Sequence, residues 1–182
     1  MLDTNAQAVI SFWFHELETK QWWIKDKSLD ELITQRFEDI HASATAGELY
    51  TWRDTPEGRL AEIIVLDQFS RNIFRNTSRA FSYDGMALVL AQEAIHAGCD
   101  KALSPTHKAF LYLPFMHSES SLIHQRATEL FNQPGLEDNY DFELKHKMII
   151  DRFGRYPHRN KIFGRESSPE ELVFLEEPGS SF

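Results

Sequence analysis

The chain has 182 residues, a length typical of one ordinary domain, and we expect a single helical domain over residues 1–182. Hydrophobic residues make up 42% of the sequence and aromatic residues 13%, which is enough for one packed core and excludes an intrinsically disordered chain. The net charge of −9 argues against general affinity for nucleic acid, because binding to a phosphate backbone needs a basic surface.

The first half of the chain carries three helix predictions. Apolar residues over 6–14 indicate a first helix. Residues 28–31 read Ser-Leu-Asp-Glu, the spacing of a capping box, and Gly47 ends the helix that this box starts. Thr55 and a following proline begin a third helix, which is apolar on most sides from Leu60 to Phe74 and is therefore expected at the centre of the fold.

Helix signals continue through the second half, and strand signals are scarce. Asp84 is expected to cap the first of these helices, and Pro114 disturbs the second. The expected ranges are 86–97, 105–113, 121–131, 139–153 and a short last helix from 169. The sequence therefore predicts an all-α fold of seven to eight helices packed as antiparallel pairs.

The expected central helix also carries charged side chains. At helical spacing, Asp67, Arg71 and Arg75 share a face with Leu60 and Ile64. Charges in line with an apolar stripe are expected to be partly buried, paired and hydrogen-bonded. A structural Asp67–Arg71 pair explains part of this pattern, but two arginines that face one carboxylate leave positive charge to spare.

A second polar segment is the loop after the helix expected over 139–153. Between Lys145 and Arg165 lie seven basic residues and one acidic residue, so this stretch carries +6 within an acidic protein. Gly154 and Pro157 should make the loop rigid, and its arginines suit bidentate capture of a carboxylate or phosphate. A solvated basic loop, or arginines that cap helix ends, is the alternative interpretation.

The third polar segment lies where an apolar helix breaks at Pro114. His117 and Glu119 follow this break, a place where polar side chains can face a cavity. His146 is expected on the apolar face of its own helix together with Phe142, although a hydrogen-bonded core histidine explains such a residue more often than a ligand does. No spacing typical of a metal site is present, and we predict no metal ligands. Convergence of His117, Glu119 and His146 on a metal or a substrate is the alternative.

Together, these segments predict one Arg/His-rich concave pocket that binds a small anionic ligand, either phosphorylated or a carboxylate. The expected ligand-binding residues are Asp67, Arg71, Arg75, His146, Arg152, Arg155, Arg159 and Asn160. If the protein is an enzyme, acid–base catalysis falls to His158, His117 or Glu119. Two alternatives stay open: a scaffold that binds an acidic peptide or protein partner in a groove, and a purely structural Arg/His network.

Long strings of the sequence resemble a family of bacterial proteins of unknown function, the domain-of-unknown-function 924 family. The strings are residues 12–14, 66–75, 110–119, 152–160, 164–165, 168–171 and the terminal pair Ser181-Phe182. The resemblance covers nearly the whole chain and implies a tetratricopeptide-like helical superfold. It implies no established activity and no agreed catalytic residues, and Ser70 stands where the family pattern has proline.

The compartment and the partners are predicted from features that the sequence lacks. No apolar run approaches the roughly 18 residues that span a bilayer, and the N-terminus has no secretion-signal pattern. The single cysteine, Cys99, cannot form an internal disulfide, so we expect a cytoplasmic protein. The sequence specifies no cofactor, predicts neither a nucleic-acid nor a membrane partner, and permits a homodimer.

Overall fold

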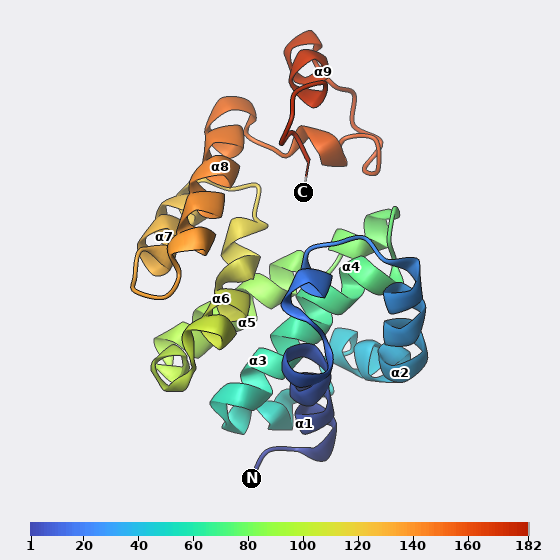
Figure 1. Ribbon diagram of the computed structural model, residues 1–182, viewed down its shortest axis with the longest axis vertical. Coiled ribbons are helices and arrows are strands. Elements are labelled where there is room, and N and C mark those ends of the chain that lie inside the picture. The colour runs from blue at the N-terminus through green and yellow to red at the C-terminus, as the bar shows by residue number, and fades with distance from the viewer. Residues whose placement is uncertain (182) are drawn as a thin grey trace.

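The computed structural model describes residues 1–181, and every regular element in that range is helical (Figure 1). The α-helices are α1 (Thr4–Ser11), α2 (Lys27–Thr45), α3 (Pro56–Ile64), α4 (Ser70–Ile73), α5 (Asp84–His96), α6 (Pro105–Met116), α7 (Ser121–Phe131), α8 (Glu137–Phe153) and α9 (Pro169–Leu175). Wider π-helical turns cover Phe12–Glu16 and Val65–Phe69. Short 3₁₀ turns cover Thr19–Trp22, Tyr50–Asp54, Ser78–Phe81, Cys99–Ala102 and Pro157–Arg159.

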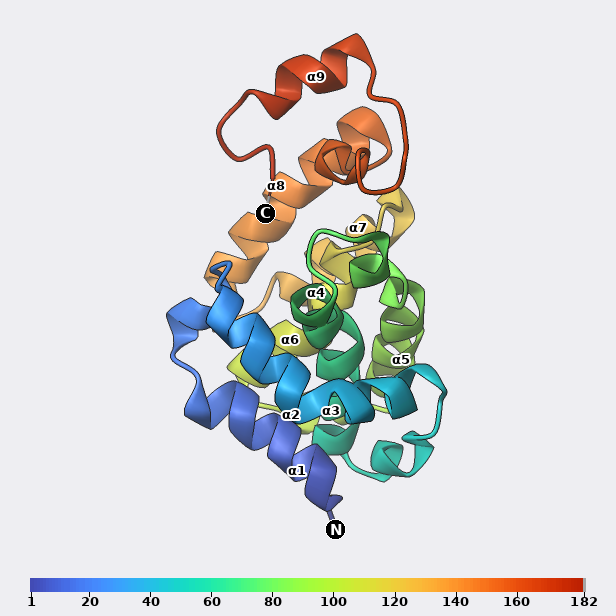
Figure 2. The same ribbon diagram turned by 90° about the vertical axis from the view of Figure 1, so that its right-hand side faces the viewer.

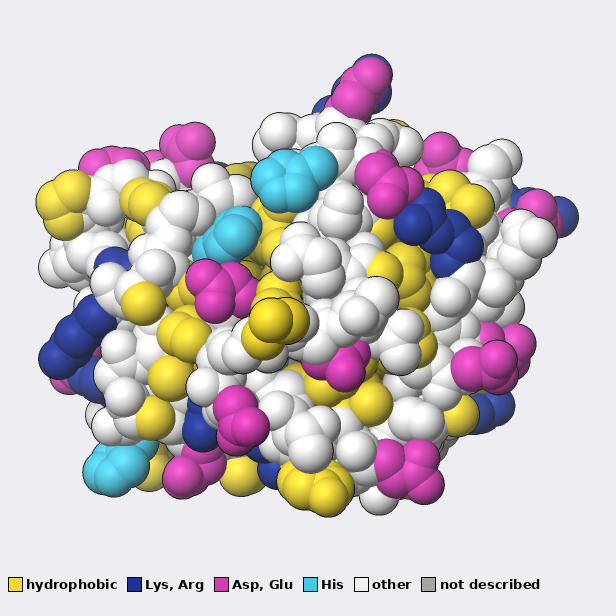
Figure 3. All heavy atoms as spheres, turned by 90° about the horizontal axis from the view of Figure 1, so that it is seen from below, with side chains coloured by type: hydrophobic (Ala, Val, Ile, Leu, Met, Phe, Trp, Pro, Cys, Tyr) yellow, Lys and Arg dark blue, Asp and Glu magenta, His cyan; other side chains and the backbone are white. Residues whose placement is uncertain are grey.

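The all-α prediction is confirmed, since no strand occurs among residues 1–181. Phe182, the last residue of the family-like strings, lies outside the described range. Within this range no helix is long and apolar enough to cross a membrane. Seen from the N-terminal end, acidic side chains are spread among hydrophobic and uncharged atoms, and basic side chains form no continuous area on that face (Figure 3).

The helices form one main body with a smaller C-terminal part at its far end (Figures 1 and 2). Helix α3 packs against α1, α5 and α6, while α2 packs against α4 and the π-helical turn before it. Helix α6 packs against α7, and α7 packs against α8, so these three follow one another across the molecule. Helix α9 lies at the end opposite the N-terminus and contacts the short turn at 157–159.

The core confirms the central position expected for the helix that begins at Pro56. From Leu60 to Ser70 every side chain is buried, and most of them have no exposed surface. A second, smaller apolar cluster joins the end of α8 to α9 and consists of Ile149, Ile150, Tyr156 and Phe174, with Phe153 packed against it. The polar residues of the predicted pocket come from both stretches of the chain, with Asp67, Arg71 and His117 within the first and Arg159 within the second.

Most of the expected helix starts are confirmed, and two are wrong. Thr55 accepts a bond from a backbone N–H in the first turn of α3, and residues 168–171 form the expected capping box. Helix α2 is capped by Asp26 rather than by the box at 28–31, because Asp26 lies two residues earlier and reaches the N–H groups first. Asp84 caps no helix, since its carboxylate is bonded elsewhere.

The expected inward face of α8 is partly wrong. Phe142 is 52% exposed, whereas His146, Ile149 and Ile150 are buried as expected. The helix begins at Glu137, two residues before the expected start. The buried stripe passes through Glu143 rather than Phe142, and this brings a carboxylate into the interior, where it bonds His124.

A π-helical turn changes the geometry of the central helix. Its expected single run to position 75 is divided into α3, the π-helical turn Val65–Phe69 and α4, which ends at Ile73. A π-helical turn holds an extra residue and rotates the face that the next helical turn presents. The prediction that Arg75 shares a face with Asp67 and Arg71 is therefore wrong, because Arg75 lies beyond the helix end.

Candidate functional site

A buried carboxylate in the π-helical turn holds a histidine from the end of α6. Asp67 is 1% exposed, and its Oδ1 atom lies 2.7 Å from Nδ1 of His117. The other carboxylate oxygen accepts a bond of 2.6 Å from the side chain of Gln68. Because Oδ1 of an ionised carboxylate can only accept, Nδ1 of His117 carries the proton and donates it. Asp67 thus fixes both the orientation and the tautomer of His117.

An arginine from α4 connects this pair to the start of α5. Arg71 donates to the backbone carbonyl of Asp67 at 2.8 Å and to its Oδ1 atom at 3.2 Å. It also forms a bidentate ion pair with Asp84, with N–O distances of 2.9 and 3.0 Å. The spare positive charge expected beside Asp67 is therefore compensated by a second carboxylate.

A second arginine reaches the same cluster from the turn at 157–159. Arg159 is 6% exposed and donates to the backbone carbonyl of His117 at 3.0 Å. Its guanidinium lies over the rings of Phe81 and Tyr156, 4.6 and 4.5 Å from their centroids. Nη1 is 3.7 Å from Asp84, while the buried Nε atom has no hydrogen-bond partner among residues 1–181.

One side of this cluster reaches solvent. The side chains of His117, Arg71 and Asp84 are 16%, 20% and 18% exposed. No hydrogen bond to Nε2 of His117 occurs in the described part of the chain. The imidazole is therefore bound on its inner nitrogen and accessible on its outer one.

The surroundings keep this imidazole neutral at pH 7. Burial, and after it the charge of Arg71, lowers the pKa of His117, while Asp67 opposes that shift. Burial alone raises the pKa of Asp67, but Arg71 and His117 outweigh it and hold the pKa below its ordinary value. Burial also lowers the pKa of Arg159, and the charge of Arg71 adds to this effect.

Three of the arginines predicted for the pocket bind carboxylates of their own. Arg75 forms a bidentate pair with Asp30 of α2. Arg152 bonds Glu170, and Arg155 forms a bidentate pair with Glu171 at 2.6 and 2.7 Å. These contacts tie α4 to α2 and α8 to α9. The structure does not place these three arginines in the cluster around His117.

Glu119 and Asn160 hold the loop that follows α8 and carries Arg159. Glu119 accepts a bond from the backbone N–H of Tyr156 at 2.8 Å and a bidentate pair from Arg165 at 2.7 and 2.8 Å. Asn160 is 1% exposed and donates to Ser167. With its carboxylate fully engaged, Glu119 anchors the loop that carries Arg159.

The other two predicted histidines lie beside Tyr156. The rings of His146 and His158 are 5.8 and 5.6 Å from that of Tyr156. Burial lowers the pKa of His146 to about 3. Burial, and next to it the charge of Arg159, lowers the pKa of His158 to about 4. Both are neutral at physiological pH.

Sequence reasoning missed the partners that complete the cluster. Asp84, Phe81 and Tyr156 all contact one of its arginines, yet none was predicted as a site residue. The signal available for Asp84 was its acidic side chain between two helices, which also fits a helix cap. Missed too was a fully buried pair of His124 and Glu143.

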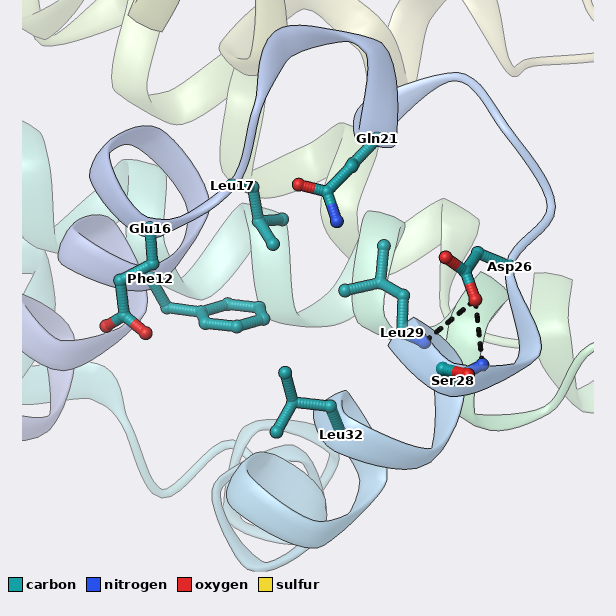
Figure 4. Close-up of a pocket in the computed structure, with 8 residues that line it drawn as sticks. All are labelled: Phe12, Glu16, Leu17, Gln21, Asp26, Ser28, Leu29 and Leu32. Carbon is teal, nitrogen blue, oxygen red and sulfur yellow. Dashed lines mark hydrogen bonds between the residues drawn. The ribbon is translucent and has the colours of Figure 1, made fainter.

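Cavities found elsewhere have a different character. One hollow of about 270 Å³ lies between the π-helical turn at 12–16 and the start of α2, lined by Phe12, Leu17, Leu29 and Leu32 with a polar rim (Figure 4). None of the predicted site residues lines it. Among residues 1–181 no group of three His, Cys, Asp or Glu side chains could hold a metal ion.

Comparison with known proteins agrees with the fold and gives no activity. The family described as "Bacterial protein of unknown function (DUF924)" matches residues 9–179. A similar solved structure is that of ATU0120, a protein of unknown function from Agrobacterium tumefaciens, with 40% sequence identity and a TM-score of 0.90. That match covers 94% of this chain and 97% of the other. No curated protein matches the chain.

Proposed function

The chain belongs to the DUF924 family of bacterial proteins of unknown function, and we propose that its Asp67–His117 pair is the acid–base centre of an enzyme that acts on a small anionic ligand. One observation carries the proposal. A buried carboxylate binds the inner nitrogen of His117, and the outer nitrogen is unbonded at a partly exposed position. This is the arrangement that a general base requires.

The chemistry of the pair is a proton transfer. Nε2 of neutral His117 accepts a proton from the bound ligand, and the imidazolium that forms is stabilised by Asp67. The negative charge that develops on the ligand faces Arg71 and Arg159, whose guanidiniums are already fixed by other contacts. Because the pKa of His117 lies below its ordinary value, the base form is the populated one at pH 7.

This proposal gives His158 and Glu119 a supporting role in place of the catalytic role predicted from the sequence. Glu119 is engaged by Arg165 and by the backbone of Tyr156, and His158 is half-buried next to Arg159 in the chain. Both support the loop rather than meet the ligand. The ligand-binding group of the proposal is Arg71 and Arg159, with His117 as the base.

A structural Arg/His network is the second candidate, and a specific observation favours it. Arg71 already forms a bidentate pair with Asp84, so the cluster joins α4, α5 and α6 without any ligand. Under this interpretation His117 is a hydrogen-bonded core residue. The tetratricopeptide-like arrangement, the peptide-binding groove, the homodimer and the cytoplasmic location stay predictions.

Histidine NMR combined with a turnover screen tests the proposal. Small anions such as acetate, succinate and inorganic phosphate should perturb the Nε2 signal of His117 but leave that of the fully buried His124 unchanged. With any substrate found, His117→Asn should lower kcat by about 10²- to 10⁴-fold, the usual contribution of a general base. His96→Asn is the matched control, since His96 is exposed and remote in sequence from the cluster.

The second candidate predicts a different result. If His117 only holds helices together, no anion perturbs its signal, and His117→Asn changes stability without changing any turnover. That outcome would replace the acid–base proposal with the structural one.

A further inference from the structure

We infer that the Nε–Nη2 edge of Arg159 binds the carboxylate of a monoanionic organic acid. The inference rests on the proposed function, because it names the ligand class of that same site. It goes further by choosing between a carboxylate and a phosphate and by assigning the contact to one edge of one guanidinium.

Arg159 is a buried cation that uses only part of its bonding capacity. Nη1 donates to the carbonyl of His117 at 3.0 Å. Nε is buried without a partner among residues 1–181, and no hydrogen bond to Nη2 occurs there either. Buried polar groups are nearly always hydrogen-bonded, and an unmade bond to a charged group is costly. A bound ligand that accepts hydrogen bonds from Nε and Nη2 would explain why a buried arginine stands at position 159.

Other arginines of the same chain indicate what acceptor fits. Arg53, Arg75 and Arg155 each direct Nε and Nη2 at the two oxygens of one carboxylate. In Arg53 the two distances to Glu62 are 2.7 and 2.6 Å. Arg159 presents the same edge with no carboxylate of residues 1–181 on it. The planar fork matches a planar carboxylate in both spacing and direction.

Rigid surroundings prepare this edge for a ligand. The guanidinium lies over the rings of Phe81 and Tyr156, and these contacts restrict its movement. Tyr156 is itself buried and donates its hydroxyl to the carbonyl of Met116 at 2.5 Å. A donor that is held in place before binding loses little conformational entropy when the ligand arrives.

The local charge favours a monoanion over a dianion. Arg71 and Arg159 are balanced by Asp67 and Asp84, and His117 is neutral. Arg159 is the less compensated of the two cations, because its nearest carboxylate oxygen is 3.7 Å away and belongs to a group that Arg71 already holds. Because these charges already sum to zero, a dianion would meet the repulsion of the two nearby carboxylates more strongly than a monoanion does.

Three probes that share a phenyl ring test the inference on the wild-type protein. Benzoate offers a planar monoanion, benzamide is its neutral counterpart, and phenyl phosphate offers a dianion. Titrations followed by calorimetry should give benzoate an affinity about tenfold or more above the other two, the difference expected for a charge-assisted bidentate bond. Benzamide binding as tightly as benzoate overturns the inference, and so does tighter binding of phenyl phosphate.

Two lysine variants locate the contact. Arg159→Lys keeps the charge but loses the bidentate edge, and it should weaken benzoate about tenfold or more. Arg126→Lys is the control, since the side chain of Arg126 is 52% exposed and pairs with Glu129 at the surface, and it should bind benzoate as the wild type does. Unchanged benzoate binding in Arg159→Lys overturns the assignment. If that variant fails to fold, the probe comparison on the wild type decides.

His117→Asn separates this inference from the proposed function. Benzoate binding that survives in this variant supports the Arg159 site even where the acid–base assay fails. A wild-type protein that binds no benzoate overturns the inference, while phosphate-dependent perturbation of His117 would still support an acid–base site for a different ligand class.

Discussion

Two histidine–carboxylate pairs in this molecule have the same inner bond and different surroundings. His117 is bonded to Asp67, and His124 is bonded to Glu143, each through Nδ1 at 2.7 Å. In the second pair neither side chain has exposed surface, whereas the side chain of His117 is 16% exposed. The distance between the partners therefore does not distinguish a candidate site from a structural pair.

The outer nitrogens differ in their contacts. Nε2 of His124 donates to the carbonyl of Ser118 at 2.8 Å and lies 3.2 Å from the hydroxyl of Tyr156. Nε2 of His117 makes no such bond within the described residues. A histidine with both nitrogens engaged can only hold structure, while one with an open nitrogen can exchange a proton with a ligand.

The charges around the two carboxylates differ as well. Arg71 holds the pKa of Asp67 below its ordinary value, against the effect of burial. Burial raises the pKa of Glu143, and only His124 and the charge of Lys147 oppose it. The comparison indicates that adjacent arginines, together with exposure of the outer nitrogen, distinguish the candidate site from its buried counterpart.

The largest effect that would test this comparison is on stability. His124→Ala removes the partner of a fully buried carboxylate and should lower the free energy of unfolding by about 3 kcal/mol. His117→Asn should cost about 1 kcal/mol, because an amide can still donate to Asp67. For a chain of this size the first loss corresponds to a Tm lower by roughly 6–12 °C. Urea unfolding measures both.

The control for these two variants is His96→Ala, at an exposed position near the end of α5. It should change stability by no more than about 0.5 kcal/mol. Equal losses in His124→Ala and His117→Asn would mean that both pairs are structural, and His117 would then no longer differ in kind from His124.

The helices could be predicted from local signals, whereas the ion pairs could not. Thr55 and the box at 168–171 specify helix starts through residues three positions apart, so the sequence alone suffices. Arg71 finds Asp84 thirteen residues away, and Arg75 finds Asp30 forty-five residues away. Such pairings depend on tertiary packing, which no local pattern records.

The predicted pocket was too large for the same reason. The prediction placed every arginine near a helix break in one group. The structure brings Asp67, Arg71, His117 and Arg159 together. The other arginines of the group bind carboxylates of α2 and α9. The π-helical turn at 65–69 added a rotation that a period of 3.6 residues cannot reveal. Polar interruptions of an apolar helix predicted the location of the cluster but not its membership.

An effect of similar size concerns the two histidines beside Tyr156 that bond backbone groups. His146 bonds the carbonyl of Phe142, and the backbone of Ser180 bonds His158. Their pKa values fall from 6.5 to about 3 and about 4, so the unfolded chain takes up protons first as the pH decreases. Stability should therefore fall as the pH is lowered from 6.5 towards 4, by about 3 kcal/mol for His158 alone.

This pH window separates the histidines from the carboxylates whose pKa is lowered. Carboxylates with lowered pKa, such as Glu171 at about 2 through its bond to Arg155, lose their contribution only below about pH 4.5. His158→Asn should flatten the dependence of unfolding free energy on pH between 6.5 and 4.5. Identical slopes in the wild type and this variant would contradict the burial argument.

The smallest expected effect is a change in the titration of His117 itself, followed by histidine side-chain NMR. The charged and titratable groups that face it are Asp67, Arg71, Asp84, Arg159 and His146. Arg71→Gln should raise the pKa of His117, because it removes a positive charge that lowers it, and Asp67→Asn should lower the pKa further. Opposite shifts in the two variants would support the assignment of Asp67 and Arg71 as the groups that tune this imidazole. Shifts of the same sign would instead mean that the variants act through a change in burial, and the contrast with His124 would then depend on exposure alone.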